Sequence, residues 1–150
     1  MKALNEMVIG ICNDHAGVEV KNYIMEQLGD KVQAFRNFGT NTTDSCDYPD
    51  YAHPMAESIE AGECDFGIAI CGTGNGISMT CNKHQGIRAA LSWEVEIAKL
   101  GRQHNNANVV GIPARFISKE KALEIVTAFL TTDFEGGRHE KRVNKIPTGK

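Results

Sequence analysis

The chain has 150 residues, of which 41% are hydrophobic and 23% are charged, and its formal net charge is −3. This length and composition predict one globular domain over residues 1–150 and exclude a disordered or collagen-like chain. The small negative charge does not favour a nucleic acid partner, although it leaves room for a local site that binds a small anion.

The start of the chain carries no recognisable targeting segment. The first apolar run, Met7–Cys12, is followed by polar Asn13, Asp14 and His15, and it is too short for a signal peptide core or a membrane span. The five cysteines are odd in number and form no Cys-x-x-Cys pair, which favours free thiols in a reducing compartment. We therefore expect a cytoplasmic protein without a membrane partner.

Apolar runs predict the strands. Val8–Ile11, Phe66–Ile70 and Val109–Ile112 barely alternate between apolar and polar residues, as expected of strands buried on both faces. Weaker strand candidates are Val32–Phe35 and Arg88–Leu91.

Apolar residues recur at helical spacing between these runs. The predicted buried stripes are Val20, Ile24 and Leu28; Ala52, Met55, Ala56 and Ile59; Ile97, Leu100 and His104; and Ala122, Ile125, Val126 and Phe129. Alternating strands and helices predict a Rossmann-like or flavodoxin-like three-layer sandwich, with a parallel sheet of about five strands covered by helices on both faces. Residues 138–143 follow Gly136-Gly137 and predict a short basic helical tail that reaches a partner subunit.

A glycine-rich loop follows the third predicted strand. Its sequence, Cys71-Gly72-Thr73-Gly74-Asn75-Gly76, lets backbone N–H groups converge on an anion at the start of a helix. The spacing is neither the G-x-G-x-x-G of a dinucleotide site nor a P-loop. Cys71 would lie near the positive end of the helix dipole. This favours its thiolate, which can act as a base or a nucleophile. The alternative is a small buried residue that closes the strand.

Other polar residues follow predicted strands or helices, where α/β proteins bind ligands. Asp14 and His15 place a carboxylate beside an imidazole, although Asp14 or Asn13 could simply cap the next helix. His104, followed by Asn105, continues an apolar stripe and is expected to point inward at the ligand end of the sheet. The alternative for His104 is a hydrogen-bonded core histidine.

Two further pairs of residues have a spacing that suits a binding site. Arg138 and Arg142 are four residues apart on one helix face, which suits a phosphate group, although a solvated basic face is the plain alternative. Cys81 and His84 have the spacing of two metal ligands but lack a second pair, so we expect no metal site.

Several motifs together resemble the type B ribose-5-phosphate isomerases. In chain order they are Asn13-Asp14-His15-Ala16-Gly17, Asp47-Tyr48-Pro49, Ile70-Cys71-Gly72-Thr73-Gly74, Arg102-Gln103-His104-Asn105 and Glu135-Gly136-Gly137-Arg138-His139. The similarity runs from about Val8 to Ile146. It implies a Rossmann-like fold, a homodimer or dimer of dimers, no cofactor, and interconversion of ribose 5-phosphate and ribulose 5-phosphate in the pentose phosphate pathway.

The resemblance also assigns roles. Cys71 is similar to the base that moves a proton between carbons 1 and 2, His104 to the residue that assists ring opening, and Thr73 to a third catalytic residue. The residues implied to bind substrate are Asp14, His15, Tyr48 and Asn105 for the sugar; Gly72, Gly74, Asn75 and Gly76 for the enediolate oxygen; and Arg115, Arg138 and Arg142 for the phosphate. Some of them are expected to come from the partner subunit.

Two rival functions stay open. An isomerase of a six-carbon sugar phosphate, such as allose 6-phosphate or galactose 6-phosphate, would use the same proton transfer. A non-catalytic module could instead hold a phosphate in the glycine loop. A binding module needs no thiol, imidazole and carboxylate together, whereas proton transfer beside a carbonyl needs a base and donors aimed at the oxyanion. The sequence therefore favours the enzyme.

Overall fold

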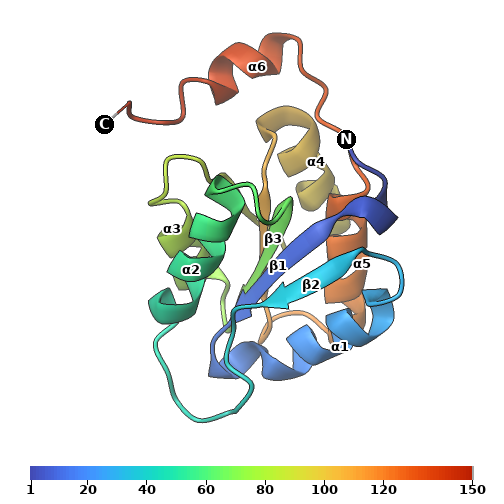
Figure 1. Ribbon diagram of the computed structural model, residues 1–150, viewed down its shortest axis with the longest axis vertical. Coiled ribbons are helices and arrows are strands. Elements are labelled where there is room, and N and C mark those ends of the chain that lie inside the picture. Colours follow the sequence, from blue (N-terminus) through green and yellow to red (C-terminus); the bar gives the residue numbers. More distant parts are fainter. Residues whose placement is uncertain (150) are drawn as a thin grey trace.

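The computed structural model describes residues 1–149 and has a five-stranded parallel sheet with the strand order β2-β1-β3-β5-β4. The strands are β1 Val8–Asn13, β2 Ala34–Asn37, β3 Phe66–Cys71, β4 Ala89–Leu91 and β5 Val109–Pro113. The helices are α1 Val18–Leu28, α2 Pro49–Glu60, α3 Asn75–Cys81, α4 Val95–Asn105, α5 Lys119–Leu130 and α6 Arg138–Val143. Short 3-10 turns cover Leu4–Glu6 and His15–Gly17. The predicted three-layer Rossmann-like sandwich is confirmed (Figure 1).

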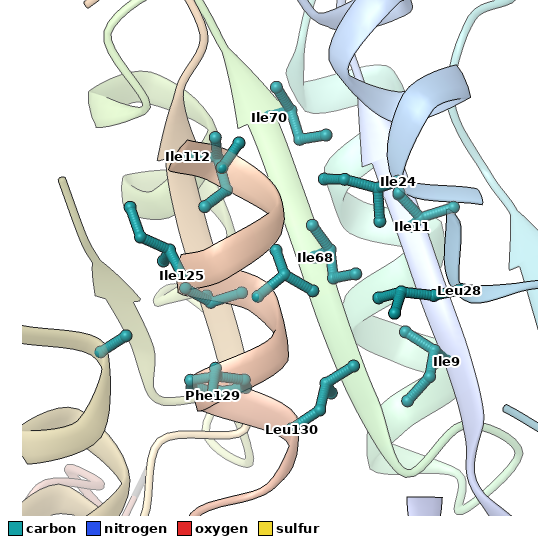
Figure 2. Close-up of a cluster of buried hydrophobic side chains, with 14 of the residues drawn as sticks. Ile9, Ile11, Ile24, Leu28, Ile68, Ile70, Ile112, Ile125, Phe129 and Leu130 are labelled. Carbon is teal, nitrogen blue, oxygen red and sulfur yellow. The ribbon is translucent and has the colours of Figure 1, made fainter. Parts of the chain in front are cut away.

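The three central strands are buried on both faces, as predicted. The larger core lies on the face covered by α1, α4 and α5, where isoleucines of β1, β3 and β5 meet apolar side chains of α1 and α5 (Figure 2). Each isoleucine buried here contributes about 1.5–3 kcal/mol relative to exposure. The labelled core residues are Ile9, Ile11, Ile68, Ile70 and Ile112 from the strands and Ile24, Leu28, Ile125, Phe129 and Leu130 from the helices.

The opposite face is covered by α2 and α3 over smaller strand residues. Alternation along the strands turns Cys12, Ala69 and Cys71 toward this second core. Gly10 and Gly67 let Met55 of α2 approach closely, because a Cβ on either glycine would lie within 3 Å of its side chain. The residues after β1 and β3 are thus held by packing on both sides of the sheet.

The predicted stripe of α4 is wrong. Ala98, Gly101 and Arg102 are buried, whereas Ile97, Leu100 and His104 are only half-buried. The arginine can be buried because its guanidinium donates to the carbonyl oxygens of Thr132 (3.0 Å) and Ala107 (2.6 Å).

Aromatic rings complete the surroundings of Arg102. Its guanidinium lies over the ring of Phe66, 4.8 Å from the centroid, and 5.8 Å from that of Phe129. Small Gly101 brings the helix against the sheet, since a Cβ there would lie 3.0 Å from that of Ala90. Close packing at Gly101 and the hydrogen bonds of Arg102 therefore decide which face of α4 is buried, and the apolar spacing of Ile97 and Leu100 does not.

Helix α6 confirms the predicted short basic tail. It stands apart from the sheet, beside α4 at the top of Figure 1, and buries His139 and Val143. Arg138 and Arg142 are exposed on it. No helix within residues 1–149 combines the length and the hydropathy that crossing a membrane requires.

Candidate active site

The carboxyl ends of the central strands form one polar edge. Cys71 at the end of β3 pairs with Pro113 of β5, and the Asp14 N–H that follows β1 donates to the Ile70 carbonyl at 3.2 Å. Asp14, Cys71 and Arg115 therefore meet at the edge where α/β sheets bind ligands. The predicted position of Asp14 and Cys71 at this edge is confirmed, and their roles stay predictions.

The glycine loop has the tight backbone that its sequence predicts. Gly74 has φ +75°, and a Cβ there would lie 2.5 Å from Leu91 Cδ1, so both conformation and space require glycine. The exposed Thr73 side chain accepts a hydrogen bond from the Asn75 N–H at 3.1 Å. The turn thus presents backbone groups and a hydroxyl just before α3.

Cys71 is both buried and at the functional edge. Its residue is 5% exposed, and its backbone carbonyl accepts from the Ala114 N–H at 2.9 Å. It belongs to the second core together with Cys12 and Cys81. Burial and the neighbouring Cys81 thiol raise the pKa of Cys12 well above its usual range, so Cys12 stays a neutral thiol. Cys12 therefore adds no competing negative charge beside Cys71.

Tyr48 reaches the glycine loop from the segment before α2. Its ring lies against Gly76, where a Cβ would stand 2.5 Å from the Tyr48 Cζ atom and 2.8 Å from its hydroxyl. Gly76 is therefore needed for this approach. The two predicted substrate residues, far apart in sequence, share one wall of the site.

Arg115 also belongs to this edge. Its N–H donates to the Gly72 carbonyl at 3.0 Å, and its Nη1 lies 3.1 Å from the place a Gly72 Cβ would occupy. The loop therefore carries a guanidinium beside its backbone, as an anion site requires.

Asp14 and His15 both make polar contacts, Asp14 with the turn that follows it and His15 with Cys46. Asp14 Oδ1 accepts from the Ala16 N–H at 3.0 Å, so Asp14 caps the 3-10 turn His15–Gly17, and its role toward a sugar stays a prediction. His15 Nδ1 accepts from the Cys46 N–H at 3.4 Å and lies 3.9 Å from Cys46 Sγ. Cys46 was missed because no local pattern links residues 31 positions apart.

A buried lysine was also missed. Lys21 is fully buried on α1, and its Nζ donates to Asn37 Oδ1 (3.3 Å), Thr40 O (2.5 Å) and Asn41 Oδ1 (2.7 Å). Burial lowers the pKa of Lys21. It fastens the segment that leads from β2 to Tyr48. A lysine beside an apolar stripe normally indicates a solvated helix flank, so the sequence carried no signal for it.

His104 lies at the opposite edge of the sheet, which corrects its predicted position. Helix α4 follows β4 and runs back, so it ends at Asn105 just before β5 begins at Val109, which pairs with Gly67 near the start of β3. The six residues of β3 separate the two edges by roughly 17 Å. No side-chain rotation brings His104 to Cys71 of the same chain.

The remaining predicted residues share the edge of His104. Asn105 ends α4 and is exposed, and Arg138 and Arg142 extend from α6, which packs on α4 (Figure 1). The His104 ring stacks on that of His139 with centroids 4.3 Å apart. The pKa of His139 is lowered, first by loss of hydration and then by the charges of His104 and Arg138.

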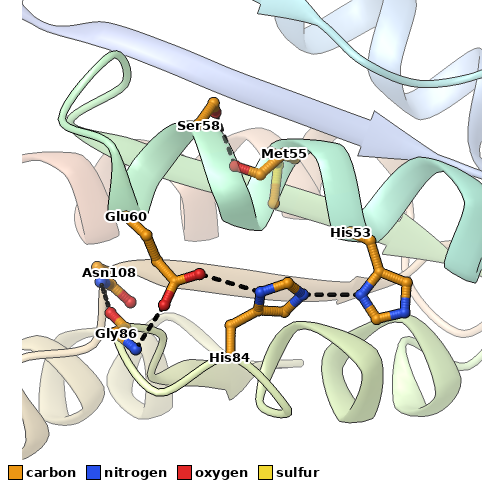
Figure 3. A network of polar contacts seen from close by, with 7 residues as sticks. All are labelled: His53, Met55, Ser58, Glu60, His84, Gly86 and Asn108. Carbon is orange, nitrogen blue, oxygen red and sulfur yellow. Dashed lines mark hydrogen bonds and ion pairs between the residues drawn. The ribbon is translucent and has the colours of Figure 1, made fainter.

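Cys81 and His84 occupy different surroundings. Cys81 is buried in the second core, whereas His84 lies in a chain of polar contacts between α2 and the loop after α3 (Figure 3). His84 Nε2 is 2.7 Å from His53 Nδ1, and His84 Nδ1 is 3.0 Å from Glu60 Oε1. Glu60 also accepts from the Gly86 N–H at 2.9 Å. These contacts tie α2 to the loop rather than pair His84 with Cys81.

Residues 9–146 match the protein family described as Ribose/Galactose Isomerase. The chain belongs to this family. The match covers nearly the whole range over which the sequence motifs resemble type B ribose-5-phosphate isomerases, and it confirms that resemblance.

Three relatives of the Ribose/Galactose Isomerase family illustrate the similarity. Ribose-5-phosphate isomerase B of Escherichia coli (strain K12) is 43% identical over 133 residues, which cover 89% of each chain. The crystal structure of a ribose 5-phosphate isomerase from Thermotoga maritima is 46% identical, with TM-score 0.91, covering 94% of this chain and 97% of that chain. Ribose-5-phosphate isomerase B from Mycoplasma genitalium, solved with bound ribulose-5-phosphate, is 42% identical, with TM-score 0.87 and 93% coverage of each chain.

Proposed function

We propose that the chain is a type B ribose-5-phosphate isomerase of the pentose phosphate pathway, acting in the cytoplasm, with residues 1–150 as one isomerase domain. The observation that carries the proposal is the Cys71 thiol at the head of a glycine loop that also holds the Arg115 guanidinium. Relatives of high similarity are named for this activity, and one has ribulose-5-phosphate bound. All five cysteines are free thiols, which supports the cytoplasmic assignment.

The chemistry is a proton transfer between neighbouring carbons. In the open-chain aldose, the Cys71 thiolate removes the proton from carbon 2, and the electron pair forms the enediolate. Returning the proton to carbon 1, with the hydroxyl proton moving from oxygen 2 to oxygen 1, gives the ketose. Loop N–H groups and Thr73 stabilise the developing oxyanion, Arg115 belongs to the phosphate site, and Tyr48, Asp14 and His15 bind the sugar.

The complete site needs two copies of the chain. Cys71 and His104 lie at opposite edges of one sheet, so a second chain must bring its His104 edge to the Cys71 edge of the first. A two-fold dimer forms two such sites at once, and pairing of two dimers would give a tetramer. His104 then protonates the ring oxygen to open the furanose, Asn105 binds the sugar, and Arg138 and Arg142 grip its phosphate.

The first experiment measures interconversion of ribose 5-phosphate and ribulose 5-phosphate by the wild-type protein and by Cys71→Ser and Cys71→Ala. We expect both variants to lose nearly all turnover while sugar-phosphate binding survives. Turnover close to wild type in either variant would refute the role of Cys71. Allose 6-phosphate and galactose 6-phosphate are run alongside, and a higher kcat/KM on either would assign the six-carbon alternative instead.

The second experiment tests the shared site. Cys71→Ala and His104→Asn chains, each expected to be nearly inactive alone on the cyclic sugar, are refolded together in equal amounts. Random pairing makes half of the dimers mixed, and each mixed dimer has one intact site, so about a quarter of wild-type activity should return. Activity that stays at the level of the two parents would exclude a site shared between chains.

A further inference from the structure

Three metal-binding side chains meet where α6 begins and α4 ends. His104 Nε2 lies 4.0 Å from Glu135 Oε1, and His139 Nε2 lies 3.5 Å from the same oxygen. One ligand atom from each of the three residues lies within 4.8 Å of the others. Glu135 and His139 are four residues apart, so the segment that leads into α6 and the first turn of α6 supply one ligand each.

One of these ligand atoms is buried without a hydrogen bond. His139 Nε2 has no hydrogen-bond partner within residues 1–149, although the His139 side chain is only 9% exposed. Buried ring nitrogens are normally hydrogen-bonded. The unpaired His139 nitrogen faces the Glu135 carboxylate and the His104 imidazole, which is the arrangement expected of an empty metal site.

We propose that His104, Glu135 and His139 bind one Zn²⁺ ion per chain and that the bound ion inhibits isomerisation by occupying the His104 nitrogen. The inhibition rests on the function proposed above, whereas the zinc site does not. Two histidines and one glutamate are a common three-residue zinc set, with a fourth position left to water. Imidazole ligands favour Zn²⁺ over Mg²⁺, which binds oxygen.

The charges around the cluster are of both signs. Glu135 supplies a negative charge against the nearby cations of Arg138 and Arg142. A sugar phosphate bound to these two arginines would compete with zinc, because both need the same His104 nitrogen.

Binding requires one local rearrangement. The rings of His104 and His139 are stacked with 15° between their planes, so their nitrogen lone pairs run side by side and do not meet at one point. Tetrahedral zinc with bonds of about 2.0–2.1 Å needs its ligand atoms roughly 3.3 Å apart. The His104 side chain is 39% exposed, so it can turn toward Glu135. Zinc would therefore unstack the two rings and clamp α6 onto α4.

The test is a titration of metal-free wild-type protein with Zn²⁺ in competition with a coloured zinc chelator, without any sugar. We expect one ion per chain, and binding weakened about tenfold or more in His139→Gln and Glu135→Gln. Matched controls are His84→Gln, which alters the other histidine pair, and Cys46→Ser, which removes the least buried thiol. Both controls should bind zinc like the wild type, and Mg²⁺ should not compete.

Several results would overturn the site. Unchanged zinc binding in His139→Gln and Glu135→Gln, or its loss in His84→Gln or Cys46→Ser, would place the metal elsewhere. Circular dichroism of the metal-free variants shows that they fold, so that loss of binding reports loss of a ligand. The visible spectrum of bound Co²⁺ must show four or five ligands, because a six-coordinate spectrum would contradict the geometry.

The inhibition has its own readout. If zinc occupies His104, wild-type turnover of ribose 5-phosphate falls over the same concentration range in which zinc binds, and a chelator restores it. Zinc binding without any loss of turnover would overturn the inhibition while leaving the metal site in place. An inactive protein that still binds one zinc through these residues would refute the proposed function alone.

Discussion

Replacing Lys21 by methionine removes the buried ammonium group that fastens residues 37–41. The three hydrogen bonds of Nζ contribute about 1.5–3 kcal/mol each, since the donor is charged, but burying that charge costs several kcal/mol. Each acceptor also keeps another donor: Asn13 Nδ2 for Thr40 O, Asn37 Nδ2 for Asn41 Oδ1, and the Gly39 N–H for Asn37 Oδ1. We therefore expect the free energy of unfolding to fall by only about 1–3 kcal/mol.

The larger effect of Lys21→Met should be on substrate binding. The fastened segment leads to Tyr48, while Cys71 is held independently by β3. If the loop is ordered only a tenth of the time, KM for ribose 5-phosphate rises about tenfold and kcat changes little. Hydrogen exchange should accelerate at the amides of residues 38–48. Lys31→Met, at an exposed position, is the control and should change neither quantity.

The pH dependence of stability gives a second test of Lys21. Because its pKa is lowered in the folded protein, the unfolded chain binds more protons between the lowered value and the ordinary one of about 10.4. Stability of the wild type relative to Lys21→Met therefore rises with pH across that window. An unchanged KM, unchanged exchange and parallel stability curves would together refute the fastening role of Lys21.

Other substitutions probe the loop, the core and the basic tail. Gly74→Ala should destabilise the protein by about 2–4 kcal/mol more than Gly62→Ala, because both glycines have positive φ but only the Gly74 Cβ would strike Leu91; equal losses by urea denaturation would contradict the steric argument. Arg102→Met should cost about 1–3 kcal/mol for each of the two carbonyl groups that lose their donor, and a total loss under about 1 kcal/mol would show that they find other donors. Arg138→Ala and Arg142→Ala should each weaken substrate binding by about 1.5–3 kcal/mol, seen in KM, and unchanged values would exclude the phosphate site.

The sheet and its carboxyl edge could be predicted because their signals are local. A run such as Phe66–Ile70 has no polar position that could face water, so a central strand is its only stable place. The glycine loop follows that strand directly, and its short side chains admit few conformations. Cys71 ends one parallel strand and Asp14 directly follows another, so both must lie at the carboxyl edge of the sheet.

The face of α4 and the burial of Lys21 could not be predicted because their partners are distant. Arg102 is stabilised by a carbonyl 30 residues away and by aromatic rings of β3 and α5. Lys21 depends on acceptors 16 to 20 residues away. The wrong position predicted for His104 had a different cause, because chain direction was overlooked. A helix that follows a parallel strand runs back across the sheet and ends near the amino ends of the strands.

If Cys71 and His104 act together as proposed, their separation within one chain makes catalysis depend on association between chains. Each fold is complete without its partner, because the core residues of both faces come from one chain. The proposed site is complete only when two opposite edges meet, so activity per chain should fall on dilution while the folded structure persists. Size-exclusion chromatography and initial rates at matched concentrations measure the two quantities together. A rate per chain that stays constant through the monomer transition would mean that one chain suffices, and with it the role assigned to His104 would fail.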